Sequence, residues 1–330
     1  MIPRYSPRDV AALFSDEHRF DTMVEVELLA AEALAEIGVL NRADVAALRE
    51  RRPVVDAAFV AEVEERERVT NHDTAAFVDA LQERIGMPEG AWIHYGLTSS
   101  DVVDTAMCRI LASAMDIVIA EATQLRDALT RRAVESIDWP ILGRTHGMHA
   151  EPTTYGVKFS LFALALQRDL ERATQAREGI AVGKLSGAVG TFSNIDPSVE
   201  QYVCSRLGLV GVPATQVIAR DRHAQVLYAC AALGTSMEQF ALEVRHLARS
   251  EVGEVQEPFW SSAKRSCTSP TTRRAPRRCP TSAIPWSRRG SAASRGCCAA
   301  SCRPASRTWR SGTNETSRTR ASSAWYCPTR

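Results

Sequence analysis

A mixture of ionisable and hydroxyl side chains occupies residues 143–154, which read GRTHGMHAEPTT and directly precede a long periodic segment. An imidazole titrates near neutral pH, so His146 is a candidate for proton transfer in acid–base catalysis. Two structural interpretations stay open beside this one. His149 could cap the helix that begins near Tyr155. Alternatively, the two histidines and Glu151 could bind a metal ion, although no further ligand cluster supports such a site.

Hydroxyl groups also gather at residues 98–105, which read TSSDVVDT. A helix that begins here would offer backbone N–H groups and the positive end of its dipole to an anion, with Thr98 and Ser99 beside them. Ordinary helix capping by the same residues is an equally good interpretation.

Three further polar segments are candidates for ligand contacts. Residues 68–74 (RVTNHDT) place His72 next to Asp73, which suits a tuned proton-transfer or phosphate-binding group but is more often a surface pair. Residues 184–191 (KLSGAVGT) form a glycine-rich turn where the backbone can approach a ligand, a weak signal by itself. Residues 215–223 (TQVIARDRH) combine an amide with two guanidinium groups near a helix start, or form a solvated cap.

Helical periodicity dominates the elements that must position these segments. Ser6 followed by Pro7 predicts a helix start, and the apolar stripe that follows is expected to end at Gly38 (Phe20, Met23, Val24, Leu28, Ala31). Asp101 is expected to cap a much longer helix, and two more long helices are expected over residues 155–177 and 221–252. No alternating strand pattern of useful length is present. Long helices bury little surface alone, so the sequence predicts an all-α fold, an extended helical bundle with long central helices shared between subunits.

The charge balance and the apolar runs of the chain argue against some classes of binding partner. Lys and Arg number 40 against 39 Asp and Glu, so no net field favours nucleic acid or an anionic membrane. No apolar run is long enough to span a membrane, and the first residues lack the apolar core of a signal peptide. We therefore expect a cytoplasmic protein.

The last quarter of the chain differs from the rest. From Arg265 onward there is no Lys, Asp, Leu, Val, Met, Phe, His or Gln, and six of the nine cysteines lie there. Such a composition cannot supply a packed core. The sequence thus predicts an N-terminal helical domain (1–100), a central helical bundle (101–259) and an irregular tail (260–330).

The order of the polar segments resembles the fumarase/aspartase superfamily. The residues that carry this resemblance are Thr98 to Asp101, 143–154, 184–190 and 216–223. Arg4 and Tyr5, residues 70–73 (TNHD) and the run RDRH at 220–223 are similar to the adenylosuccinate lyase family in particular. The resemblance covers roughly residues 1–259. It implies a homotetramer with active sites assembled from three subunits, a nucleotide substrate, and β-elimination of fumarate from adenylosuccinate and the related carboxamide ribotide of purine biosynthesis.

The resemblance also implies roles for single residues. His146 matches the general acid, and Thr98 and Ser99 match hydroxyls that bind the succinyl carboxylates. The remaining matches are nucleotide, phosphate and other substrate contacts (Arg4, Tyr5, Asn71, His72, Asp73, Gln216). No cofactor or metal is implied.

The catalytic base of the resembled family is missing from this sequence. That base is a Ser in a loop with the signature GSSAMPHKRNP, expected soon after residues 251–258. When the tail is back-translated and read one base upstream, the window from Arg274 to Trp286 can spell GSSAMPHKRNPM, and residues 308–329 can spell a further block of the family. Each shifted position admits about four of twenty residues, so the odds of a chance match of this length are on the order of one in ten million or worse. We infer a frame displacement that begins between about Phe259 and Thr272.

Two rival functions remain. One is another superfamily enzyme, such as argininosuccinate lyase or a carboxymuconate cycloisomerase, which would not use Arg4, Tyr5 and His72 for a nucleotide. The other is a non-catalytic helical scaffold whose basic, Cys-rich tail binds nucleic acid or zinc. The frame displacement explains the tail with fewer assumptions, and the Cys spacings match no ordinary zinc pattern.

Overall fold

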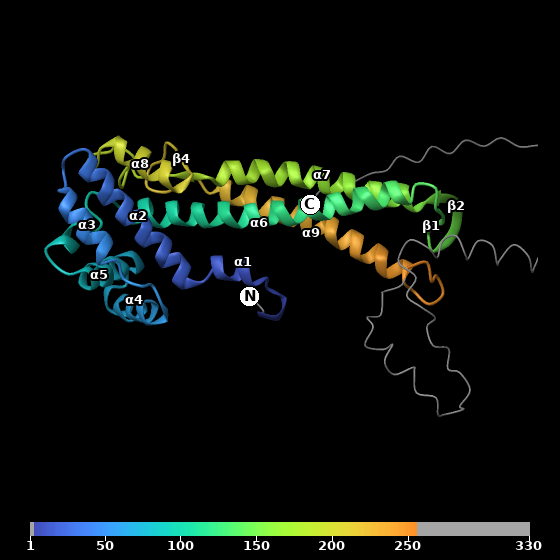
Figure 1. Cartoon of the computed structure of the whole chain (residues 1–330), viewed down its shortest axis with the longest axis horizontal. Helices are drawn as coiled ribbons and strands as arrows, with labels where there is room; N and C mark the ends of the chain where they lie inside the picture. Colours follow the sequence, from blue (N-terminus) through green and yellow to red (C-terminus); the bar gives the residue numbers. More distant parts are fainter. Residues whose placement is uncertain (1–2, 256–330) are drawn as a thin grey trace, which may run out of the picture.

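Three long helices run side by side along the long axis of the molecule (Figure 1). They are α6 (Ser99–Glu135), α7 (Tyr155–Ile180) and α9 (Asp221–Leu247), and α7 packs against both others. The structure is a computed structural model and describes residues 3–255. With 37 residues, α6 is about 55 Å long at about 1.5 Å per residue. The predicted all-α bundle with long central helices is confirmed.

Most of the shorter helices gather at the end of the molecule where α6 begins, whereas η1 and α1 lie nearer its middle (Figure 1). Their bounds are η1 Pro3–Tyr5, α1 Arg8–Leu13, α2 Asp16–Glu36, α3 Arg42–Glu50, α4 Ala57–Thr70, α5 Asp73–Ile85, η2 Glu89–Trp92 and α8 Pro197–Leu207. The predicted start at Ser6 is wrong in detail, because Pro7 is the N-cap of α1 and no side chain caps that helix. A second start follows at Ser15, whose hydroxyl accepts the His18 amide at 3.1 Å. The apolar stripe therefore belongs to α2, which ends at Glu36 just before Gly38.

Two pairs of strands interrupt the helices. β1 (Pro140–Thr145) and β2 (Met148–Thr154) form an antiparallel hairpin with an irregularity between Leu142 and Arg144. β3 (Val182–Gly183) and β4 (Val210–Gly211) form a short parallel pair. The expectation of no useful strand is thus wrong for the segment before α7. Most residues of the hairpin are exposed, so it carries no alternation of apolar and polar side chains.

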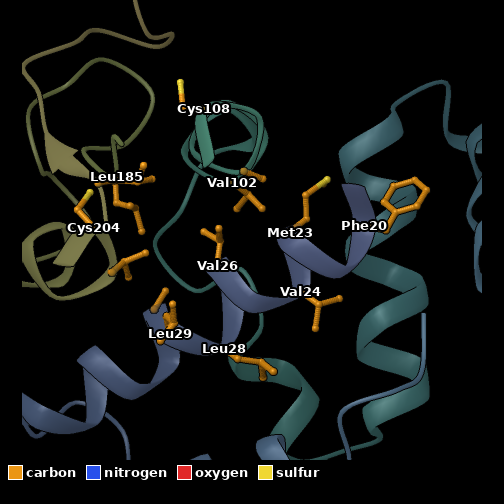
Figure 2. Packing of buried hydrophobic residues seen from close by; sticks show 14 of the residues in the cluster. Phe20, Met23, Val24, Val26, Leu28, Leu29, Val102, Cys108, Leu185 and Cys204 are labelled. Atoms are coloured by element: carbon orange, nitrogen blue, oxygen red, sulfur yellow. The ribbon is translucent and has the colours of Figure 1, made fainter. Parts of the chain in front are cut away.

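The main core lies where α2 crosses the start of α6. Figure 2 shows Val26 of α2 facing Val102 of α6, with Leu185 and Cys204 beside them. Three phenylalanines fill the gap between α2, α4 and α5: the rings of Phe20 and Phe77 stack with centroids 5.6 Å apart, and Phe59 meets both edge-on. Each such aromatic pair adds about 0.5–1.5 kcal/mol beyond the buried area. This core makes the start of α6 a rigid platform.

A smaller apolar cluster supports the hairpin at the other end of the bundle (Leu129, Ile141, Tyr155, Phe159, Ala163, Leu166, Leu247). Large apolar side chains on the long helices, and Ile137 just after α6, stay exposed (Val134, Ile137, Val157, Leu161, Leu164, Leu227, Tyr228, Leu242). An open groove of about 380 Å³ is lined by four of them, Val134, Ile137, Val157 and Leu164, and by their neighbours. An apolar surface of this extent is typical of a protein–protein interface. Within residues 3–255, no helix is long and apolar enough to cross a membrane.

Candidate active site

The start of α6 presents two partly exposed hydroxyls. Thr98 is the N-cap residue and Ser99 the first residue of the helix. The Asp101 carboxylate reaches back and accepts the Thr98 amide at 2.9 Å. Asp101 therefore caps the helix as expected, although from the third helical position, where its carboxylate completes a capping box with the N-cap residue Thr98. Ordinary capping is therefore the correct interpretation for Thr98 and Asp101, and Thr98 and Ser99 are both partly exposed beside the positive end of the helix.

The glycine-rich segment 184–191 packs directly against this helix start. Lys184 and Asp101 are both fully buried and form an ion pair of 2.5 Å. The amides of Ser186 and Gly187 donate to the same carboxylate, each at 3.2 Å. The Asp101 carboxylate therefore binds groups from two segments that lie more than eighty residues apart in sequence.

The segment that carries Gln216 joins the same region. The Ile218 amide donates to Asp104 at 2.8 Å, and Arg220 pairs with the other oxygen of this carboxylate at 2.9 Å. Gln216 itself is exposed. Gly190 has a φ of +77°, and a Cβ there would lie 1.9 Å from the carbonyl oxygen of Ala214, so only glycine allows these loops to meet.

His94 lies four residues before Thr98 and was not among the predicted site residues. Its backbone has a φ of 66°, its amide donates to Glu27 at 2.8 Å, and its Nδ1 is 2.7 Å from the other oxygen of that carboxylate. Burial lowers the pKa of His94, but the hydrogen bond and charge of Glu27, aided by Asp101, outweigh burial and raise it. The only sequence signal for His94 is its place in a polar connection, because its partner lies 67 residues away.

We expect the free energy of unfolding that His94 contributes to fall as pH rises. Since its pKa is raised on folding, the contribution is complete below the unfolded value, 6.5, and is lost as pH increases through the raised folded value. Urea denaturation at about pH 6 and about pH 9 measures this change. His94→Gln should flatten the pH dependence over that window, and an unchanged slope in the variant would contradict this assignment.

His72 occupies a helix cap. Asn71 ends α4 in the left-handed conformation with a φ of 52°, and the Nδ1 of His72 accepts the Ala75 amide at 3.2 Å at the start of α5. In the neutral ring the proton must then lie on Nε2, on an exposed side chain. His72 and Asp73 form an exposed pair 3.6 Å apart. The surface-pair interpretation is therefore correct, and His72 in addition caps the start of α5.

His146 occupies the turn of the β1–β2 hairpin. Its φ is 53° and that of Gly147 is 72°, the pair of positive values that a two-residue hairpin turn requires. His146 and His149 are both exposed. His149 does not cap α7, because Thr154 accepts the Val157 amide there at 3.2 Å. Within the described residues no group of three or more His, Cys, Asp or Glu is placed to hold a metal ion.

One chain does not bring all the candidate residues together. The segments that begin at Thr98, Lys184 and Thr215 meet at one end of α6, whereas the hairpin with His146 lies at the opposite end (Figure 1). At about 1.5 Å per residue, α6 separates them by about 50 Å. Arg4 and Tyr5 lie in η1, where both are exposed. The base loop expected after residue 258 falls outside residues 3–255.

Comparisons with known proteins indicate a single relationship. The chain matches the lyase family over residues 6–273. It is 47% identical to an adenylosuccinate lyase of Bacillus subtilis over 275 residues, which make up 83% of this chain and 62% of that protein. An adenylosuccinate lyase of Staphylococcus saprophyticus is 43% identical over 274 residues, with the same two shares. The chain thus spans less than two thirds of these relatives.

Solved structures agree with the fold. A fumarate lyase from Mesorhizobium sp. BNC1 superposes with a TM-score of 0.69 at 26% identity, over 76% of this chain and 59% of that one. A 3-carboxy-cis,cis-muconate lactonizing enzyme from Pseudomonas putida gives a TM-score of 0.71 at 26% identity, over 78% and 60%. These proteins share the helical architecture of this chain.

Proposed function

Since this chain belongs to the lyase family, we propose that it is by descent an adenylosuccinate lyase of purine nucleotide biosynthesis, a cytoplasmic enzyme. The observation that carries the proposal is the 47% identity to an adenylosuccinate lyase over 275 residues. The muconate-lactonizing neighbour is only 26% identical. A lactonizing enzyme is therefore the weaker candidate.

The proposed reaction is a β-elimination. A base removes the proton from the carbon next to a carboxylate, the C–N bond breaks, a C=C bond forms in fumarate, and an acid protonates the departing nitrogen. We assign the acid role to His146 and carboxylate binding to Thr98 and Ser99, whose hydroxyls flank a positive helix end. The other proposed contacts to the nucleotide and its phosphate are Arg4, Tyr5, Asn71, His72, Asp73 and Gln216. The chemistry requires neither metal nor cofactor.

The proposed site is shared between chains of a homotetramer. Its support is the length of α6, which keeps the hairpin of one chain about 50 Å from the Thr98 end of the same chain. A second support is the exposed apolar surface of the long helices, which a partner bundle would cover. In such an assembly the hairpin of one chain can lie beside the start of α6 in a neighbouring chain, although it is too far from the start of its own α6.

The chain as it stands is proposed to lack its base. The family match ends at residue 273, directly before Arg274, where the displaced reading frame spells the base loop. A gene restored to that frame would regain this loop and the family block at 308–329.

The test is to present the frame-restored protein with three substrates and follow the products. We expect fumarate release from adenylosuccinate and none from argininosuccinate, with no lactone formed from carboxymuconate. Preference for either of the other substrates would shift the assignment to that enzyme. Inactivity towards all three, in a protein that folds as a helical tetramer, would favour the scaffold.

A further inference from the structure

Three polar side chains are buried on one face of the first two turns of α6. Asp101 is 0% exposed, Asp104 4% and Thr105 0%. None is among the residues proposed to touch substrate. Burying carboxylates is unfavourable unless every oxygen has partners, so their hydrogen bonds indicate what they do.

Asp101 is bound by groups from two segments. It accepts the Thr98 amide of its own helix, the amides of Ser186 and Gly187, and the Lys184 ammonium. That ammonium also donates to the Gly187 carbonyl at 2.6 Å. Every one of these partners belongs to the helix start or to the glycine-rich loop.

Thr105 and Asp104 extend the same pattern. The Thr105 hydroxyl lies 3.0 Å from both the amide and the carbonyl oxygen of Lys184, so it is donor and acceptor to one residue. Asp104 receives the Ile218 amide and the Arg220 guanidinium from the segment that carries Gln216. One helix face thus fastens two loops that are separate in sequence.

A stability role alone does not explain this choice of residues. A buried ion pair contributes little net stability, and apolar residues of similar volume often do as well or better. Apolar side chains, however, could not accept the amides of Thr98, Ser186 and Gly187. The buried groups set geometry that an apolar core would leave undefined.

We propose that Asp101, Asp104 and Thr105 are positioning residues: Asp101 and Thr105 hold the loop 184–191, and Asp104 holds the segment 215–220, against the Thr98–Ser99 hydroxyls as one preorganised carboxylate-binding surface. The ligand named here, a dicarboxylate such as fumarate, rests on the proposed function. The proposal that these residues hold the two loops in place does not depend on the identity of the ligand.

Hydrogen exchange of the full chain tests the fastening. Asp101→Asn should speed amide exchange in 184–191 about tenfold or more, and Asp104→Asn should do so in 215–220, each with less effect on the other loop. Asp116→Asn is the matched control, since Asp116 is on the same helix and pairs with Arg177 at 2.8 Å but is half exposed. Equal effects of the three variants on both loops would overturn the proposal.

Thr105 provides a milder pair of variants in case the charge changes unfold the chain. Thr105→Val keeps the shape and removes both hydrogen bonds, whereas Thr105→Ser keeps the hydroxyl. We expect Thr105→Val alone to loosen 184–191, with Thr105→Ser restoring protection. Loosening by both variants, or by neither, would show that the hydroxyl does not fasten the loop.

Calorimetric titration with fumarate tests the purpose of the fastening. Asp101→Asn and Thr105→Val should weaken binding about tenfold or more, while Thr105→Ser and Asp116→Asn bind as the parent does. Unchanged affinity in a variant whose loop is loosened would refute the role in binding. If the parent itself does not bind fumarate, the proposed function fails, and the exchange measurements still decide whether these residues fasten the loops.

Discussion

His146→Gln in the frame-restored protein is expected to lower kcat for fumarate release by roughly three orders of magnitude or more. Glutamine keeps much of the size of the imidazole but cannot deliver a proton to the departing nitrogen near neutral pH. The position favours such a role, because His146 projects from a two-residue turn and is exposed. Steady-state kinetics with adenylosuccinate measures the loss. A turnover within tenfold of the parent would remove His146 from the mechanism.

Two controls separate chemistry from folding. His149→Gln changes an equally exposed imidazole on the same hairpin and should lower kcat by less than about tenfold. Mixing the inactive His146→Gln protein with an inactive Thr98→Ala protein should restore part of the activity, since a hairpin from one chain and a helix start from another would make some complete sites. No recovery after verified subunit exchange would contradict the shared site.

The chain as it stands is expected to release fumarate no faster than a protein-free blank, whereas the frame-restored protein turns over adenylosuccinate. Proton removal from carbon needs a positioned base, and the loop that would supply it is absent from the displayed reading frame. The chain keeps Thr98 and Ser99, the hydroxyls proposed to bind carboxylates, so weak binding without turnover is the expected behaviour. Expressing both forms and following fumarate measures this difference.

The nucleotide sequence around codons 255–275 provides an independent check on the same idea. It should contain a gained or lost base relative to the frame that spells the loop. Activity of the displayed chain equal to that of the restored one would refute the missing-base argument, and an inactive restored protein would undermine the proposed substrate.

Sequence reasoning succeeded where periodicity was long. The stripe that begins at Phe20, the long helix after Thr98 and the helices that follow Tyr155 and Asp221 are all present. It was less successful where the structure depends on backbone pairing, as in the hairpin, or on which residue caps a helix, as at the start of α6. Most residues of the β1–β2 hairpin are exposed, so it has no period to detect, and the sequence alone does not distinguish Thr98 from Asp101 as the N-cap.

The candidate site was predicted in pieces rather than as a whole. The segments at 98–105, 184–191 and 215–223 were each weak signals, and the structure brings them together through Asp101 and Asp104. The His94–Glu27 pair joins residues 67 positions apart, and no local pattern encodes such a contact. The distance between the hairpin and the helix start depends on where α6 begins and ends, which the sequence defines only approximately.

The length of α6 also has a consequence for a cell that carries two versions of the gene. A site built from distant ends of different chains makes activity depend on which chains meet, so a cell with both an intact and a displaced copy of the gene would hold a mixed population of assemblies. The present chain keeps α6, α7 and α9, so under the proposed shared site it would supply a hairpin or a helix start to one site while leaving another without a base. Enzyme activity would then not change in proportion to the fraction of intact chains, because one assembly can contain both kinds of chain. The displaced allele would therefore differ in its effect from a deletion of the gene, and it would not be silent.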